Sequence, residues 1–112
     1  HEDDQRAYDL TVAMLDAEPD VAAIFMGGGG IDGIVRARRE RPNRKLAIVS
    51  TEISEMTHGH LVEDLVDIAL SHEFEQVAST VVRAMEMPSM ANYPGVPVIY
   101  NIPMKIVIRE NV

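Results

Sequence analysis

The sequence contains no cysteine, which excludes disulfide bonds, thiolate metal sites and thiol nucleophiles. It also has no apolar run close to the roughly 18 residues that a membrane-spanning helix needs, so we expect no membrane contact. Basic residues are few: 10 Lys and Arg stand against 18 Asp and Glu, and the resulting charge of −8 repels a phosphate backbone. We therefore expect no contact between this segment and nucleic acid.

The length and composition allow one modest core. At 112 residues with 46% hydrophobic content, the chain forms one domain at most. It begins with His1 rather than Met, and it ends directly after a strand-like segment. We expect residues 1–112 to be the C-terminal portion of a single domain in a longer protein.

Short apolar runs alternate with amphipathic helical patterns along the chain. The expected elements are a helix from Asp3 or Asp4 to before Pro19, a strand over 21–26, a helix from about Ile31 to near Pro42, a strand over 45–50, a helix capped by Ser54, a strand over 66–71 and a helix over 73–87. The first strand is of the nearly all-apolar kind that is covered on both faces. This alternation predicts βαβ crossovers, and hence an α/β fold with a parallel sheet flanked by helices.

The end of the chain is less regular. Residues 87–97 contain three prolines and one glycine, which predicts a connecting loop. An extended stretch follows, in which Pro103 cannot donate a ladder hydrogen bond and so marks an edge, a bulge or a strand break.

The most distinctive stretch is "MGGGGIDGIVRAR", residues 26–38, in which four glycines lie between an apolar run and a helical pattern. Glycine destabilises ordered structure by about 0.5 to 1 kcal/mol per position relative to alanine, so clustered glycines indicate close approach of backbone to a ligand. A tight strand-to-helix turn is the simpler alternative. Gly28, Gly30 and Gly33 also match the G-x-G-x-x-G spacing of dinucleotide-binding enzymes.

In open parallel sheets, ligands bind at the carboxyl ends of the strands, which gives three candidate segments. They are residues 27–32, residues 51–52 and residues 71–73. Glu52 stands roughly where the ribose-binding acid of a dinucleotide enzyme belongs. Against that interpretation, an entire amphipathic helix precedes the glycine strand, and a lone glycine motif is a weak signal.

The order of several longer stretches resembles the C-terminal part of the effector-binding domain of lac-repressor family transcription regulators. The segments that carry the likeness are "EPDVAAIF", the small-residue loop before "GIVRA", "KLAIVSTEIS", "DIALSHEFEQ" and the terminal "REN". The resemblance spans nearly the whole chain and implies a class I periplasmic-binding-protein-like fold. None of these segments is a catalytic signature, so the likeness depends on order and spacing.

The resemblance implies a two-lobed domain that closes on a small effector, commonly a sugar or a related metabolite. By position it places Gly28, Gly29 and Gly30 with Asp32, then Glu52, and then His72, in the loops that face the cleft. The chain departs from the family in lacking an Asn-Asp pair in the first loop and in having His72 where an amide is common. If Asp32, Glu52 and His72 converge, they could hold the hydroxyl groups of a sugar-like ligand.

The same resemblance implies that a DNA-binding headpiece and most of an N-terminal lobe lie outside these residues, and that the parent protein is cytoplasmic. The helix over 73–87 would then belong to the other lobe. We expect its apolar stripe to fold back onto the sheet or to be buried in a second copy, most simply in a two-fold homodimer. A secreted solute receptor of a sugar transporter, which has the same fold, is the main alternative.

Other chemistry is weakly supported. Residues 58 and 60 are histidines near several acids, but residues two apart on a helix do not share a face, so we expect no metal site. No local motif such as G-x-S-x-G fixes a catalytic serine, so we expect neither an enzyme nor a cofactor. The basic cluster over 36–45 is interrupted by Glu40 and lacks aromatic residues, which favours a solvated helix face over a phosphate contact.

Overall fold

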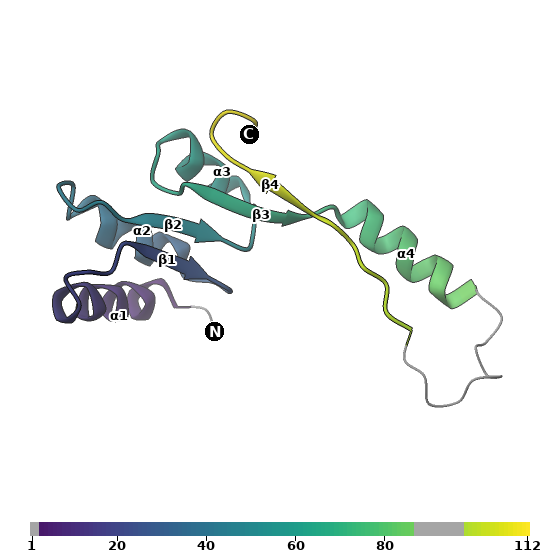
Figure 1. Cartoon of the computed structure of the whole chain (residues 1–112), viewed down its shortest axis with the longest axis horizontal. Helices are drawn as coiled ribbons and strands as arrows, with labels where there is room; N and C mark the ends of the chain where they lie inside the picture. Colours follow the sequence, from purple (N-terminus) through teal and green to yellow (C-terminus); the bar gives the residue numbers. More distant parts are fainter. Residues whose placement is uncertain (1–2, 87–97) are drawn as a thin grey trace. The chain divides into compact units, whose positions relative to one another are not determined.

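The computed structural model describes residues 3–86 and 98–112, so the loop predicted over 87–97 lies outside the described residues. The elements in chain order are α1 (Asp4–Ala17), β1 (Ala23–Met26), α2 (Ile31–Arg39), β2 (Ala47–Ser50), α3 (Glu55–Val62), β3 (Ile68–His72), α4 (Phe74–Glu86) and β4 (Met104–Val107) (Figure 1). Two compact units make up the chain. The first contains His1–Ser71 and Ile106–Val112, and the second contains His72–Lys105.

The four strands form one sheet in the order β1-β2-β3-β4. β1 pairs with β2 in parallel, with Met26 opposite Ser50. β2 pairs with β3 in parallel, with Ser50 opposite Ala69. The expected parallel βαβ crossovers are therefore present, and the carboxyl ends of β1 and β2 meet at one edge of the sheet. β4 begins directly after Pro103 and runs opposite to β3 in Figure 1.

Local sequence explains where the helices begin. The Asp3 carboxylate caps α1 by accepting hydrogen bonds from the backbone N–H groups of Gln5 and Arg6. Ser54 caps α3 in the same way by accepting from the Thr57 N–H. α2 has no side-chain cap: Gly30 precedes it with a left-handed φ of 93°, a conformation that glycine adopts without steric cost.

The core of the first unit is an apolar cluster between the helices and the sheet. Its buried members are Met26, Ile31, Ile34, Val35, Ile48, Leu61, Val66, Ala69 and Val107. Each of the first three strands, the last strand and two helices contributes, so the core joins distant segments of the chain. At about 25 cal/mol per Å² of apolar surface buried, this cluster is the main favourable contribution to folding of the unit.

The expectation that the first strand is covered on both faces is wrong for the described chain. β1 lies at the edge of the sheet, and only Met26 of its four residues is buried. Phe25 points from the opposite face and is 66% exposed. An apolar run alone could not distinguish a strand that is covered on both faces from one that is covered on one.

The second unit contains α4, whose apolar residues recur at helical spacing as the sequence predicts. None of the described side chains of α4 is buried. Phe74 is 78% exposed and Met85 is 81% exposed. Among the described helices, none has both the length and the apolar character needed to cross a membrane.

Candidate functional site

A pocket of about 220 Å³ opens at the edge of the sheet where β1 and β2 end. One wall is the glycine loop (residues 27–30) with the start of α2, and the other is the β2–α3 loop (residues 51–54) with the first turn of α3. The lining residues are Asp4, Met26, Gly28, Gly29, Gly30, Ile31, Glu52, Ser54, Met56 and Thr57. The pocket thus lies where open parallel sheets ordinarily bind ligands.

Four of the residues expected to bind a ligand, Gly28, Gly29, Gly30 and Glu52, line this one pocket. Their segments are brought together by the parallel register of β1 and β2, because each segment directly follows one of those strands. Asp32 and His72, which were expected beside them, are not among the lining residues. That any of these residues binds a ligand remains a prediction.

The glycines of the loop and helix serve different purposes. A side chain on Gly28 would meet nothing within 4 Å, so its backbone is open to the pocket. Gly33, by contrast, lies against the backbone of α1, where a Cβ atom would overlap Asp4 and come within 2.7 Å of the Tyr8 nitrogen. The glycine that completes the dinucleotide-like spacing is therefore used to pack α2 against α1.

The second wall is held by hydrogen bonds within the loop. The Ser50 hydroxyl donates to the Glu52 carbonyl oxygen at 2.9 Å and accepts from the Glu52 N–H at 3.2 Å. Both contacts fix the backbone of Glu52, an exposed residue that lines the pocket. The Ser54 and Thr57 hydroxyl oxygens lie 3.1 Å apart, as part of the α3 cap.

The charge of the pocket is negative. Among the residues that the structure describes, the ionisable ones that line it are Asp4 and Glu52, and none of the described basic residues does so. The other lining residues are the three glycines, the hydroxyl residues Ser54 and Thr57, and the apolar residues Met26, Ile31 and Met56. Such a surface suits hydroxyl groups that donate to carboxylates and C–H faces that pack on apolar side chains. It is unfavourable for phosphate groups.

Asp32 has a partner that the sequence did not reveal. Its Oδ1 lies 2.7 Å from Nε2 of His60, and the His60 side chain is only 12% exposed. Because a carboxylate can only accept, the imidazole N–H donates in this contact. Asp32 is in the first turn of α2 and His60 is in the last turn of α3, so the bond connects the two helices that begin at the pocket walls.

His72 belongs to the second unit, apart from the pocket residues of the first. There it lines a separate hollow of about 510 Å³. The other residues of that hollow are Phe74, Val77, Tyr100, Asn101 and Ile102. Convergence of His72 with Glu52 remains a prediction.

Among the described residues, no group of three or more His, Asp or Glu side chains is arranged to hold a metal ion. His58 is exposed, whereas His60 turns toward Asp32. The two histidines thus differ in surroundings, as their spacing on a helix predicts.

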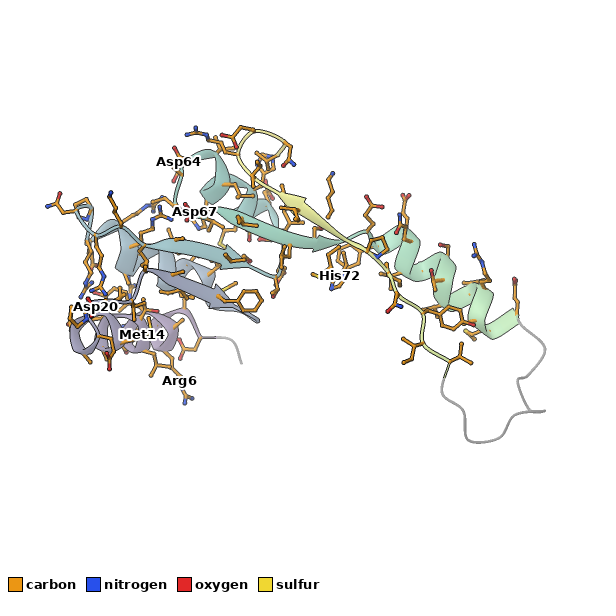
Figure 2. The ribbon with its side chains drawn as sticks, in the orientation of Figure 1. Arg6, Met14, Asp20, Asp64, Asp67 and His72 are labelled. Atoms are coloured by element: carbon orange, nitrogen blue, oxygen red, sulfur yellow. The ribbon has the colours of Figure 1, made fainter. Side chains whose placement is uncertain are left out.

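The five arginines of the basic cluster over 36–45 contact acids, an amide and carbonyl oxygens, and most of these contacts lie at the exposed surface. The pairs are Arg36 with Gln5 and the Tyr8 ring, Arg38 with Asp67, Arg39 with Glu63, Arg41 with Asp16, and Arg44 with carbonyl oxygens at the end of α1 and in the loop to β1. Asp67, labelled in Figure 2, also accepts from the Ile48 N–H and so joins α2 to two strands. The arginines therefore contribute to the fold.

No protein-family model matches the sequence, and no curated protein matches it significantly. Solved structures do match. GanP, a glucose-galactose binding protein from Geobacillus stearothermophilus, is 18% identical with a TM-score of 0.77, covering 98% of this chain and 39% of its own. A sugar-binding protein of a sugar ABC transporter from Bacillus halodurans is 18% identical with a TM-score of 0.74, covering 99% of this chain and 42% of its own.

A third similar structure is an ABC transporter periplasmic solute binding protein from Actinobacillus succinogenes 130z with bound D-allose. It is 18% identical with a TM-score of 0.72, covering 98% of this chain and 38% of its own. The chain thus spans about two fifths of the length of the solved structures that it matches. These likenesses confirm the expected fold class: an α/β chain with a helix-flanked sheet that forms part of a periplasmic-binding-protein-like fold.

Proposed function

We propose that the chain is the C-terminal portion of the effector-binding domain of a bacterial transcription regulator similar to the lac repressor. Its pocket would bind a sugar or a related small metabolite, and closure would be transmitted to a DNA-binding domain elsewhere in the parent protein. The observation that carries the ligand-binding part is the pocket itself. The open backbone of the glycine loop and the acidic residue Glu52 line one pocket at the carboxyl edge of a parallel sheet.

The lining supports an uncharged, hydroxyl-rich ligand. The Glu52 and Asp4 carboxylates can accept hydrogen bonds from hydroxyl groups, and each such bond to a charged group contributes about 1.5 to 3 kcal/mol. A pyrophosphate would have to approach two acidic residues with none of the described basic residues in the lining. The nicotinamide-dinucleotide alternative is therefore the weaker one, and we propose no catalytic role for the chain.

A solute receptor of a sugar transporter is the second candidate function. The observation in its favour is that the similar solved structures are sugar-binding or solute-binding proteins, several of them of ABC transporters. The encoded sequence upstream of His1 separates the two. A helix-turn-helix domain there supports the regulator and a cytoplasmic location, whereas a signal peptide supports the receptor.

Ligand binding can be tested by following the glycine amide signals in ¹H–¹⁵N NMR spectra during titration. The probes are D-glucose, D-galactose and D-allose, with NAD as the competing class. Because the pocket is only part of a two-lobed cleft, we expect weak, saturable shifts of the signals of Gly28, Gly29 and Gly30 with at least one sugar. Saturation by micromolar NAD, with no response to the sugars, would contradict the proposal.

A matched pair of variants separates the pocket from a general charge effect. Glu52→Gln removes a pocket carboxylate, so we expect sugar affinity to fall about tenfold or more. Glu55→Gln removes an equal charge from an exposed residue in the first turn of α3 that is not among the lining residues, and we expect no change. Equal responses of the two variants would show that Glu52 does not contact the sugar.

A further inference from the structure

The two walls of the pocket are connected by a side-chain contact away from the pocket itself. One wall continues into α2, which begins at Ile31, and the other continues into α3, which begins at Glu55. Residues from the starts of both helices line the pocket. Any shift of one helix start relative to the other therefore changes the width of the pocket.

The contact between Asp32 and His60 joins these two helices. The Asp32 carboxylate lies one residue after Ile31, which lines the pocket, and its Oδ1 is 2.7 Å from His60 Nε2. The imidazole is largely buried, so solvent competes little for its N–H. The carboxylate itself is partly exposed, with 40% of its side chain accessible.

The placement of both groups suits the ends of their helices. Asp32 is in the first turn of α2, where a negative charge interacts favourably with the helix dipole, and His60 is in the last turn of α3, where a donor or a positive charge does so. Asp32 thus places a negative charge at the start of α2, which has no side-chain cap, and contacts α3 at the same time.

We infer that Asp32 and His60 are positioning residues that set the spacing between the glycine loop and the β2–α3 loop, and thereby tune the affinity of the pocket. The inference that this spacing controls sugar binding rests on the proposed function. The positioning itself does not, because it concerns only the geometry of the walls. Asp32 acts here through His60, without touching the ligand.

The test compares four variants of the chain by two measurements. Asp32→Ala and His60→Ala break the contact, whereas His60→Gln keeps an N–H donor near the position of Nε2. His58→Ala is the control, because it removes an exposed histidine from the same helix. The measurements are the backbone amide shifts of Gly28, Gly29 and Gly30 without ligand, and the affinity for D-galactose, D-glucose and D-allose by NMR titration.

We expect Asp32→Ala and His60→Ala to shift the glycine amide signals and to weaken sugar binding about threefold to tenfold, which is within the effect that residues without ligand contact can have. His60→Gln should restore most of both properties, and His58→Ala should change neither. If the alanine variants acted only by destabilising the fold, His60→Gln would not restore the glycine signals and the affinity. Because Asp32 is partly exposed, its alanine variant provides the comparison even if His60→Ala unfolds.

Two outcomes distinguish failure of this inference from failure of the proposed function. If the amide signals of Gly28, Gly29 and Gly30 have the same chemical shifts in Asp32→Ala as in the wild type, and the wild-type chain binds sugar, the positioning role alone is wrong. If the glycine amide signals shift in both alanine variants and return to the wild-type values in His60→Gln, the positioning role is upheld. If in addition no sugar binds, the proposed sugar-binding function is wrong.

Discussion

Gly33 is a residue whose identity is set by packing between two helices. A Cβ atom there would collide with the backbone of Asp4 and Tyr8 on α1. We expect Gly33→Ala to lower the free energy of unfolding by about 1 to 3 kcal/mol, because α2 must move away from α1. Urea denaturation measures the change.

The matched control is Gly59 in α3, where an added Cβ would meet nothing within 4 Å. Gly59→Ala should stabilise the chain by about 0.5 to 1 kcal/mol, because alanine favours helix. If both substitutions changed the free energy of unfolding in the same direction, close contact of α1 and α2 would not be the reason for glycine at position 33.

Tyr8 has a raised side-chain pKa. Its pKa is raised above the usual 10.0, chiefly because the phenol donates a hydrogen bond to Glu40; desolvation and the charge of Glu40 add to the rise, while Arg36 and Arg41 oppose it. Because the pKa of Tyr8 is higher in the folded state, the contribution of protonated Tyr8 to folding stability is fully present below pH 10.0. It is lost as the pH rises through the folded-state value.

We therefore expect Glu40→Gln to move the titration of Tyr8 to lower pH. Because the amide retains only a neutral acceptor, both the hydrogen-bond and the charge contributions decrease. An NMR titration of ¹³Cζ-labelled tyrosine measures the midpoint, and Glu63→Gln is the control for a change of net charge. An unchanged midpoint in Glu40→Gln would show that Glu40 is not the cause.

At the residue scale, the sequence predicts part of the candidate site. Gly28 and Glu52 were identified because they directly follow parallel strands, and such positions share one sheet edge whatever the details of packing. The partner of Asp32 was missed because it lies 28 positions away, on a helix whose rotation depends on the whole core. The hydrophobic pattern of α3 is too weak to fix that rotation from sequence.

Among the elements, α1 depends on Arg44 for its connection to the sheet. The guanidinium donates to the carbonyl oxygens of Leu15 at 2.6 Å and Glu18 at 2.7 Å, and further to Pro19 and Val21. These groups lie at the end of α1 and in the loop to β1, where helical carbonyl oxygens lack partners. The fork of Arg44 therefore holds the loop in place.

We expect Arg44→Lys to lower the free energy of unfolding by about 1 to 3 kcal/mol, because an ammonium group cannot reach the same set of oxygens. Arg6→Lys is the control. Arg6 lies on the exposed face of α1 in Figure 2, and its side chain has no hydrogen-bond partner among the described residues. Chemical denaturation of both variants gives the comparison, and an equal loss in the two would exclude a specific role for Arg44.

The order of the elements was predictable because helical and strand-like periodicities alternate clearly and because caps such as Asp3 and Ser54 are local. Each of the first three strands starts two residues later than predicted, because pairing begins only at Ala23, Ala47 and Ile68. Exposure of Phe25 was not predictable. Apolar character says that a side chain favours burial, but the surface that buries it is a property of the assembled protein.

At the scale of the whole molecule, the exposed apolar surface of α4 is the feature that most favours self-association in solution. The apolar stripe of the helix comprises Phe74, Val77, Ala78, Val81, Val82 and Met85, and none of the described side chains of α4 is buried. Soluble monomers rarely leave an apolar patch of more than a few hundred Å² uncovered. A net charge of −8 opposes association only weakly at physiological salt, where screening acts within about 8 Å.

We therefore predict that the chain self-associates in solution through α4, most simply as a two-fold dimer, because such symmetry lets the same stripe cover its own copy. Val81→Glu places a charge in the middle of the stripe and should shift the chain to monomer. Gln76→Glu adds the same charge to the opposite face of the helix and should leave the association unchanged. Light scattering at tens of micromolar measures the mass of each form. A monomeric wild-type chain, or equal effects of the two variants, would exclude α4 as the contact surface and leave its stripe to be covered by another part of the parent protein.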